Sequence, residues 1–334
     1  MALPTCRGAA ASRRGMFARA AMLSAVFCAL TSAPGVFGAP SASARAPARA
    51  TPPKHLVVLA HGLGGTSRDL LRFEQALMAC DASVLALAIS GNEGRTKDGV
   101  RAGSARVERE VRAAVANHPS LRRISFVGNS LGGLYVREAA CALHEPRRPF
   151  GLRGERIAGL APEAFVTIAS PHLGTRLLPW CPPALQGLPA RAFAGQTASD
   201  LFLRTLVLAD MTDERHLRAL RAFRRRVLYA NAGGDAMVQP YTAAIDGARR
   251  GVGPRERKMA SRLRSMPWRT VLVEFRWLRF VPIAHNMICA LSRDAVCRAV
   301  FARGGAVVDD AAASVCCSCT RPAQLRSTCE TFRA

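Results

Sequence analysis

Short runs of apolar, β-branched residues alternate with longer amphipathic stretches along the middle of the chain. The runs are almost continuously apolar, as expected of strands that are buried on both faces of a parallel sheet. Six runs predict strands, at residues 55–60, 83–88, 124–128, 164–169, 226–231 and 270–275. Four amphipathic stretches predict helices, at residues 68–79, 104–117, 131–143 and 286–302. This alternation predicts an α/β fold with a mostly parallel sheet flanked by helices.

Two segments interrupt the alternation. Residues 173–225 are longer than a simple crossover, and they contain the run PWCPPALQGLP and two expected helices near residues 198–208 and 214–223. We expect this segment to form a cap-like insertion over the site. Residues 247–267 are rich in Arg and Gly, and we expect them to be exposed.

The first 53 residues contain six arginines, no lysine and no acidic residue. A basic stretch precedes the 11-residue apolar run AAMLSAVFCAL. A membrane-spanning helix needs roughly 20 such residues, so this run instead fits the apolar region of a secretory signal peptide. The Ala/Ser/Pro/Arg-rich stretch that follows fits either a transit peptide or a flexible linker. We therefore expect a targeting segment and linker at residues 1–53, and a location in the secretory pathway or a plastid rather than the cytosol.

The remaining chain is expected to form one α/β domain at residues 54–303, followed by a Cys-rich tail at residues 304–334. Nine of the 11 cysteines follow the targeting segment, and the tail reads VCCSCTRPAQLRSTC. Its single CxxC, formed by Cys316 and Cys319, has no second CxxC or histidine pair nearby, so we expect no metal site and no cofactor. Disulfides between tail and body are expected in an oxidising compartment, and buried free cysteines are the alternative.

The formal net charge is +24, and because lysine occurs only three times, nearly all of the basic charge is arginine. No motif of a nucleic-acid-binding protein accompanies it, so we expect no specific nucleic-acid partner. A basic surface is attracted to anionic lipid headgroups, and salt weakens that attraction. Peripheral contact with an anionic membrane is therefore an expectation, and ordinary solvated arginine is the alternative.

The candidate nucleophile is Ser130, in the sequence ISFVGNSLGGLY at residues 124–135. Gly128, Ser130 and Gly132 form a G-x-S-x-G motif that joins a predicted strand to a predicted helix, as a nucleophile elbow does. Such a turn brings two backbones so close that the flanking positions cannot carry side chains. The helix that follows also favours developing negative charge at its N-terminus. A plain Gly-rich turn is the alternative interpretation.

A second Gly-rich motif, HGLGG at residues 61–65, follows the first predicted strand. In α/β-hydrolases the loop at this place supplies one backbone N–H of the oxyanion hole, and the residue after the nucleophile supplies the other. The expected donors are Leu63, with Gly62 as its alternative, and Leu131. We expect His61 to orient the loop rather than to act as a base.

With these motifs the sequence resembles the lipase-like serine esterase family of α/β-hydrolases known as DUF676, over about residues 54–291. The resemblance is carried by VVLAHGLGG, FVGNSLGGLYVREA, VTIASPHLGT, LYANAGGDAMVQPYTAAI and AHNMI. Asn129 departs from the histidine that the family usually places before the serine. The N-terminal segment and the tail lie outside the resemblance.

The chain order serine, acid, histidine selects the remaining site residues. Asp235 follows a predicted strand, and the resemblance implies that it is the acid. Three other aspartates are alternatives by position: Asp210, Asp213 and Asp246. His285 is the only histidine after Asp235, which makes it the candidate base. The resemblance thus implies a carboxylic-ester hydrolase acting on an acyl lipid through an acyl-enzyme. A thioesterase or acyltransferase of the same fold, or a non-catalytic membrane-associated pseudohydrolase, are the alternatives.

Overall fold

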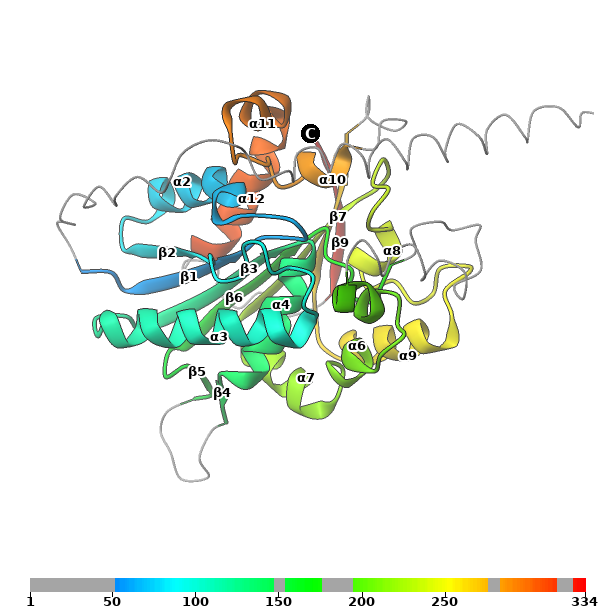
Figure 1. Cartoon of the computed structure of the whole chain (residues 1–334), viewed down its shortest axis with the longest axis horizontal. Coiled ribbons are helices and arrows are strands. Elements are labelled where there is room, and N and C mark those ends of the chain that lie inside the picture. The colour runs from blue at the N-terminus through cyan, green and yellow to red at the C-terminus, as the bar shows by residue number, and fades with distance from the viewer. Residues whose placement is uncertain (1–51, 147–153, 176–194, 276–282, 317–326) are drawn as a thin grey trace, which may run out of the picture.

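The computed structural model describes residues 52–146, 154–175, 195–275, 283–316 and 327–334 (Figure 1). Three predicted features lie wholly or partly outside these ranges. They are residues 1–51 of the expected targeting segment, the PWCPPALQGLP run of the insertion, and Cys317 and Cys319 of the tail.

Within the described residues, seven strands form one parallel sheet in the order β2-β1-β3-β6-β7-β8-β9. The strands are β1 (His55–Ala60), β2 (Val84–Ala88), β3 (Arg123–Asn129), β6 (Ala161–Ile168), β7 (Arg225–Asn231), β8 (Arg269–Glu274) and β9 (Thr328–Arg333). A short antiparallel pair, β4 (His144–Glu145) and β5 (Arg156–Ile157), lies apart from the sheet. The six predicted strands are confirmed, with shifts of a few residues at their ends.

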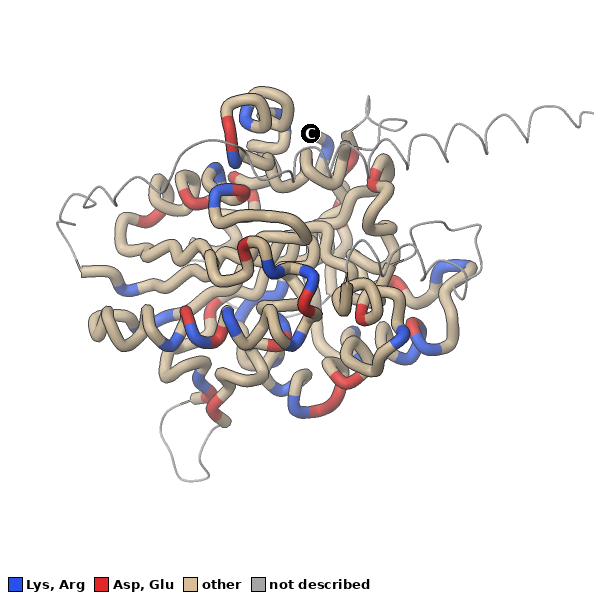
Figure 2. Tube along the Cα trace, in the orientation of Figure 1, with Lys and Arg blue, Asp and Glu red and all other residues tan. Residues whose placement is uncertain are grey.

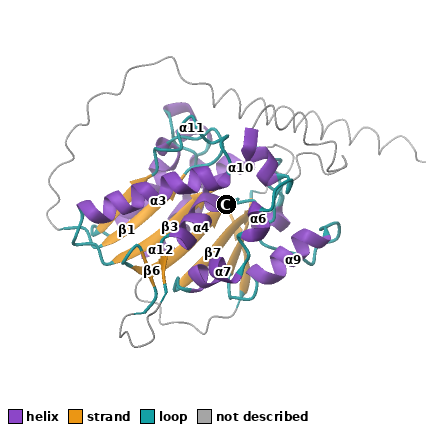
Figure 3. Cartoon of the chain, turned by 60° about the horizontal axis from the view of Figure 1, so that its bottom comes forward, coloured by secondary structure: helices purple, strands orange, loops and turns teal. Residues whose placement is uncertain are grey.

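Helices cover both faces of the sheet (Figures 1 and 3). One layer contains η1 (Ser67–Leu70), α2 (Leu71–Cys80), α10 (Ala284–Met287), α11 (Ala295–Val300), η2 (Ala302–Gly304) and α12 (Gly305–Cys316). The other contains α3 (Val100–Asn117), α4 (Leu131–Ala142), α6 (Val207–Asp210), α7 (Glu214–Arg221) and α9 (Pro254–Leu263). The short helix α8 (Pro240–Ala243) follows β7. The predicted α/β class is confirmed.

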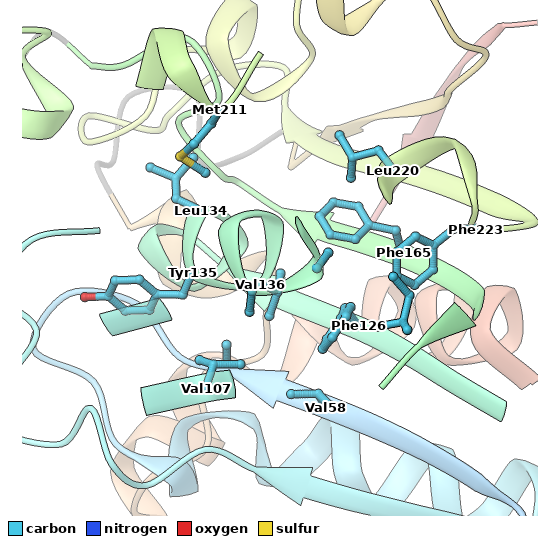
Figure 4. Close-up of a cluster of buried hydrophobic side chains, with 14 of the residues drawn as sticks. Val58, Val107, Phe126, Leu134, Tyr135, Val136, Phe165, Met211, Leu220 and Phe223 are labelled. Atoms are coloured by element: carbon cyan, nitrogen blue, oxygen red, sulfur yellow. The ribbon is translucent and has the colours of Figure 1, made fainter. Parts of the chain in front are cut away.

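Alternation along the strands divides the core between the two layers. In β1, Leu56 and Val58 pack on the α3/α4 side, whereas Val57 and Leu59 pack on the α2/α12 side. Successive strand residues point to opposite faces, so a strand covered on both sides must be apolar throughout. Phe223 joins the α3/α4 side, with its ring centroid 5.8 Å from that of Phe126 (Figure 4).

Two segments differ from the expectation, one of them only in part. Residues 286–302 do not form one helix: Ala290 has a positive φ of 48°, and Asp294 starts α11 by accepting a hydrogen bond from the Cys297 N–H. Residues 247–267 are not simply exposed, because they contain α9, which buries Met259 and Leu263 in the core. The apolar residues of α9 recur every three or four positions and so form one buried face.

The sequence assigns residues 304–334 to a tail outside the domain. In the structure α12 packs against α2, and β9 pairs with β8 along its whole length. Cys329 lies in β9 and is a free, exposed thiol, while Cys141 and Cys289 are free and buried. In the ranges described above, no helix is both long and apolar enough to cross a membrane.

The described part of the insertion packs on the core. It comprises a helix at residues 195–201, followed by α6 and α7. Asp200 accepts a hydrogen bond from the Val100 N–H at the start of α3, at 2.8 Å. Leu208 and Met211 lie in the same apolar cluster as Leu134 of α4 (Figure 4). These contacts fix the insertion against α3 and α4.

Candidate active site

Ser130 lies at the sharp turn between β3 and α4. Its φ of 53° and ψ of −125° are strained for a residue that has a side chain. A Cβ on Gly132 would lie 2.1 Å from the Ala60 carbonyl oxygen, and one on Gly128 would lie 2.4 Å from the Gly133 backbone nitrogen. Both approaches are to backbone, which cannot rotate away. The two glycines of the motif are therefore required by space.

The structure brings Ser130, His285 and Asp235 together. His285, on the short helix α10, has its Nε2 atom 2.9 Å from Ser130 Oγ and its Nδ1 atom 2.9 Å from Asp235 Oδ2. Along the chain, Ser130 follows β3, Asp235 follows β7, and His285 is in α10, the first described helix after β8. The imidazole is thus placed to exchange a proton with the hydroxyl while the carboxylate holds its other nitrogen.

The Asp235 side chain is only 1% exposed, and several donors hold its carboxylate. Its Oδ1 atom accepts hydrogen bonds from the N–H groups of Met237 (2.9 Å) and Val238 (2.8 Å), and its Oδ2 atom accepts one from Asn231 Nδ2 (2.8 Å). Burial alone raises the pKa of Asp235, but attraction to His285 and these hydrogen bonds hold the pKa below its ordinary value. The carboxylate is therefore ionised at neutral pH.

The alternative aspartates have other partners. Asp210 pairs with Arg101 at 2.8 Å, and Asp213 contacts His216 at 2.6 Å. Asp246 accepts a hydrogen bond from a backbone N–H two residues along the chain. In the described residues, Asp235 is the aspartate whose carboxylate reaches His285.

The Gly-rich loop after β1 lies directly against the serine. A Cβ on Gly62 would lie 2.9 Å from Ser130 Cβ and 3.4 Å from its Oγ. Leu63 follows, and Leu131 is the first residue of α4. Among the described residues, neither the Leu63 nor the Leu131 backbone N–H has a hydrogen-bond partner. His61 Nδ1 lies 3.0 Å from the Gly62 oxygen, within the loop itself.

Sequence reasoning missed the role of the PHLGT turn after β6. The Leu173 N–H donates to Thr242 Oγ1 at 2.8 Å, and that hydroxyl donates to the Gly174 carbonyl oxygen at 2.7 Å. Thr175 Oγ1 donates to the Met237 carbonyl oxygen at 2.5 Å. The turn therefore fastens the loop that holds Asp235. The PHLGT motif was the signal in the sequence that marked this turn. Its partners, Thr242 and Met237, lie more than 60 residues further along the chain, so the contacts could not be inferred.

The arrangement supplies acid–base and nucleophilic groups. No group of three His, Cys, Asp or Glu side chains in the described ranges is spaced to hold a metal. A serine hydroxyl, an imidazole and a buried carboxylate in this order are the groups that acyl transfer requires. A parallel sheet with this turn at the end of β3 has the α/β-hydrolase fold, as predicted.

Comparison with known proteins defines the family. The family described as "Putative serine esterase (DUF676)" matches residues 50–246, which is more than half of the chain. The chain belongs to this serine esterase family.

Two curated relatives are yeast proteins. "Putative lipase ROG1" of Saccharomyces cerevisiae is 31% identical over 204 residues, covering 58% of this chain and 28% of that protein. "Putative lipase C4A8.10" of Schizosaccharomyces pombe is 28% identical over 211 residues, covering 58% of this chain and 26% of that protein. The chain thus spans less than a third of the length of these relatives.

Solved structures with similar chains include two bacterial proteins. The lin2722 gene product of Listeria innocua has a TM-score of 0.39 at 10% identity, with 84% of this chain and 98% of that chain covered. A thermostable carboxyl esterase from Bacillus coagulans has a TM-score of 0.39 at 13% identity, with 78% and 92% covered.

Proposed function

We propose that the protein is a carboxylic-ester hydrolase in which Ser130 attacks the ester. The hydrogen bonds from Ser130 Oγ through His285 to Asp235 are the observation that carries the proposal. His285 removes the hydroxyl proton as Oγ bonds to the carbonyl carbon, and Asp235 stabilises the resulting imidazolium. The Leu63 and Leu131 N–H groups receive the oxyanion. The alcohol leaves with the proton from His285, and water then releases the acid from the acyl-enzyme.

We further propose that the substrate is an acyl lipid. The curated relatives carry the name lipase, which supports a substrate of this class.

Labelling with a fluorophosphonate tests the nucleophile. This probe forms a bond to an activated serine, and we expect the folded wild-type protein to label and the Ser130→Ala variant not to label. A folded wild-type sample that stays unlabelled would instead favour a non-catalytic pseudohydrolase. Circular dichroism of both samples controls for folding.

The fate of the acyl group separates hydrolysis from transfer. Incubation of the enzyme with an acyl lipid and increasing glycerol should give free fatty acid as the main product. Acylated glycerol as the main product would show an acyltransferase, and faster turnover of an acyl thioester than of the matched ester would show a thioesterase.

We also propose peripheral contact with an anionic membrane through α9. Figure 2 marks basic positions along α9 and the turn before it. Arg257, Lys258 and Arg262 are exposed on the face of α9 opposite Met259 and Leu263, which are buried. Such a face attracts anionic headgroups, and salt screens the attraction.

Vesicle sedimentation tests this contact. Binding to phosphatidylglycerol-containing vesicles should exceed binding to phosphatidylcholine vesicles, and it should fall at high salt. Changing Arg257, Lys258 and Arg262 to Gln should reduce it. The matched control changes three exposed arginines of α3 to Gln, namely Arg101, Arg109 and Arg112. Equal losses in both variants would contradict a specific role for α9.

A further inference from the structure

A buried ion pair joins the loop that bears Leu63 to the segment that bears His285. Arg293 donates from Nε to Asp69 Oδ1 at 2.9 Å and from Nη2 to Asp69 Oδ2 at 2.8 Å. The Asp69 side chain is 4% exposed and that of Arg293 is 15% exposed. Two parallel, charge-assisted hydrogen bonds fix both distance and orientation. The pair is therefore a rigid connection rather than a surface contact.

Further hydrogen bonds reinforce the same junction. The Ser292 N–H and Oγ–H both donate to the Asp69 carbonyl oxygen, at 3.1 and 3.0 Å. Ser292 Oγ in turn accepts from the Arg72 N–H at 3.0 Å. On the other side, Thr66 Oγ1 donates to Asp69 Oδ1 at 3.0 Å. Asp69 thus contacts the end of the Gly-rich loop and the segment after α10 at once.

The junction is continuous with both parts of the candidate site. A Cβ on Gly65 would lie 2.7 Å from Asp69 Oδ2 and 2.7 Å from His61 Nδ1, so the carboxylate packs against the Gly-rich loop. At its other end this loop meets Ser130 through Gly62.

The histidine side of the junction is equally compact. Hydrogen bonds from the Ile288 N–H to the Ala284 oxygen (3.0 Å) and from the Leu291 N–H to the Asn286 oxygen (3.1 Å) fold the segment between His285 and Ser292. A shift at Ser292 is therefore passed to the helix that carries His285.

We propose that Asp69 and Arg293 are a positioning pair that sets the Leu63 N–H and the His285 imidazole at their working separation. This inference rests on the proposed function of the site. Neither side chain touches the reacting atoms; each acts through the loop or helix that it holds. Oxyanion donors and the base must both meet the transition state within a few tenths of an ångström. Loss of the pair should therefore lower kcat more than it raises KM.

The test measures kcat per active site on p-nitrophenyl butyrate. Fluorophosphonate titration counts the sites, so unfolded protein does not contribute. Asp69→Asn keeps the shape of the side chain and removes its charge, and kcat should fall about 10- to 100-fold with KM within about twofold. Arg293→Gln should behave alike, and the double variant should lose little more than either single variant, because the two residues act as one unit.

The matched control is Asp309→Asn, which breaks the more exposed Arg72–Asp309 ion pair at 2.5 Å. It should leave kcat per site unchanged. A kcat for Asp69→Asn within about twofold of wild type, even with a lower melting temperature, would show that the pair is only structural and would overturn the proposal.

Ser292→Ala provides a second measurement if Asp69→Asn does not fold. It removes the hydroxyl that donates to the Asp69 carbonyl oxygen and accepts from the Arg72 N–H, and it keeps both charges. A drop in kcat of about 3- to 10-fold is expected, the size of effect that neutral hydrogen bonds have. An unchanged kcat would count against the proposal. Wild-type protein that does not label would overturn the proposed function itself, whereas labelled wild type with unaffected variants would overturn the positioning role alone.

Discussion

The glycines around Ser130 are set by the distance between backbones. β3, α4 and the end of β1 converge so closely that the Cα positions of Gly128 and Gly132 face main-chain atoms. A main-chain neighbour cannot change rotamer, so an added methyl group must displace a strand or a helix. Because this steric requirement restricts both positions to glycine, the motif can be recognised in the sequence.

Gly132→Ala should therefore destabilise the protein by about 3 kcal/mol, the upper part of the range for overpacking. Urea unfolding measures this free energy. Gly154→Ala is the control, because a methyl group added there would have no atom within 4 Å, and its effect should stay within about 0.5 kcal/mol. Equal stability of the two variants would contradict the close approach at Gly132.

Asn231 supports the acid of the site from the end of β7. Its Nδ2 atom donates to the same Asp235 oxygen that contacts His285. Asn231→Leu keeps the size and removes the donor, and kcat/KM for ester hydrolysis should fall about 10- to 100-fold, since hydrogen bonds to charged groups contribute about 1.5–3 kcal/mol. Unchanged kcat/KM would show that the backbone N–H groups of Met237 and Val238 suffice.

The sequence predicts the three principal site residues better than it predicts the residues that position them. Ser130 lies in a motif whose glycines are required by close backbone contacts. His285 was selected because it is the only histidine after Asp235 in the sequence. Asn231, Asp69 and Arg293 are ordinary polar residues by sequence. Asp69 and Arg293 are separated by 224 positions, so their pairing depends on the completed fold and leaves no local pattern.

Helix α7 is held on α4 by a histidine between two carboxylates. His216 Nδ1 lies 2.6 Å from Asp213 Oδ1, and Nε2 lies 3.0 Å from Glu138 Oε2. Burial alone lowers the pKa of His216, but interactions with nearby Cys141 and hydrogen bonds with Glu138 and Asp213 raise it from 6.5 to about 10. Protonated His216 therefore links α7 to α4, the helix that begins at the serine turn.

A raised pKa in the folded state gives a definite dependence on pH. The stabilisation is fully present below pH 6.5, decreases above it and is lost as the pH passes about 10. The wild type should exceed His216→Gln in unfolding free energy by roughly 2 kcal/mol at pH 6, and the difference should shrink towards pH 10. Urea unfolding across this range measures it, and a constant difference would argue against protonated His216.

Some strands and helices can be predicted from the sequence and others cannot. The central strands were predicted because both of their faces are buried, which demands uninterrupted apolar residues. β9 was not predicted, since its sequence TCETFR is polar and five of its six residues are exposed at the sheet edge. The apolar pattern predicted one helix across the break after α10. The feature that starts α11 is one hydrogen bond from the Cys297 N–H to the Asp294 side chain, which that pattern does not reveal.

The parallel sheet explains how residues so far apart in sequence meet. The seven strands of the sheet all point the same way, so their carboxyl ends lie at one edge, where Ser130 follows β3 and Asp235 follows β7. Ser130 and His285 are 155 positions apart and yet form a hydrogen bond there. Sites in α/β folds lie at this carboxyl edge for the same reason.

The edge strand β9 contributes to the stability of the whole sheet. Deletion of residues 328–334 would leave unpaired the N–H and C=O groups of β8 that face β9, and such edges associate with other chains. We expect the melting temperature to fall by about 5 °C or more and light scattering to rise with concentration. Glu330→Gln, which removes only the partly exposed ion pair with Arg269, should change stability by less than about 1 kcal/mol. Identical melting of full-length and truncated protein would contradict this role.

Mass spectrometry of the reaction intermediate tests the central claim most directly. Wild-type enzyme would be mixed with p-nitrophenyl butyrate, quenched in acid within milliseconds, digested and analysed by peptide mass. A butyryl group on Ser130 is the predicted result, and it should be absent from the Ser130→Ala enzyme. Ester cleavage by folded protein with a butyryl group on another residue, or on none at any quench time, would contradict the proposed nucleophile.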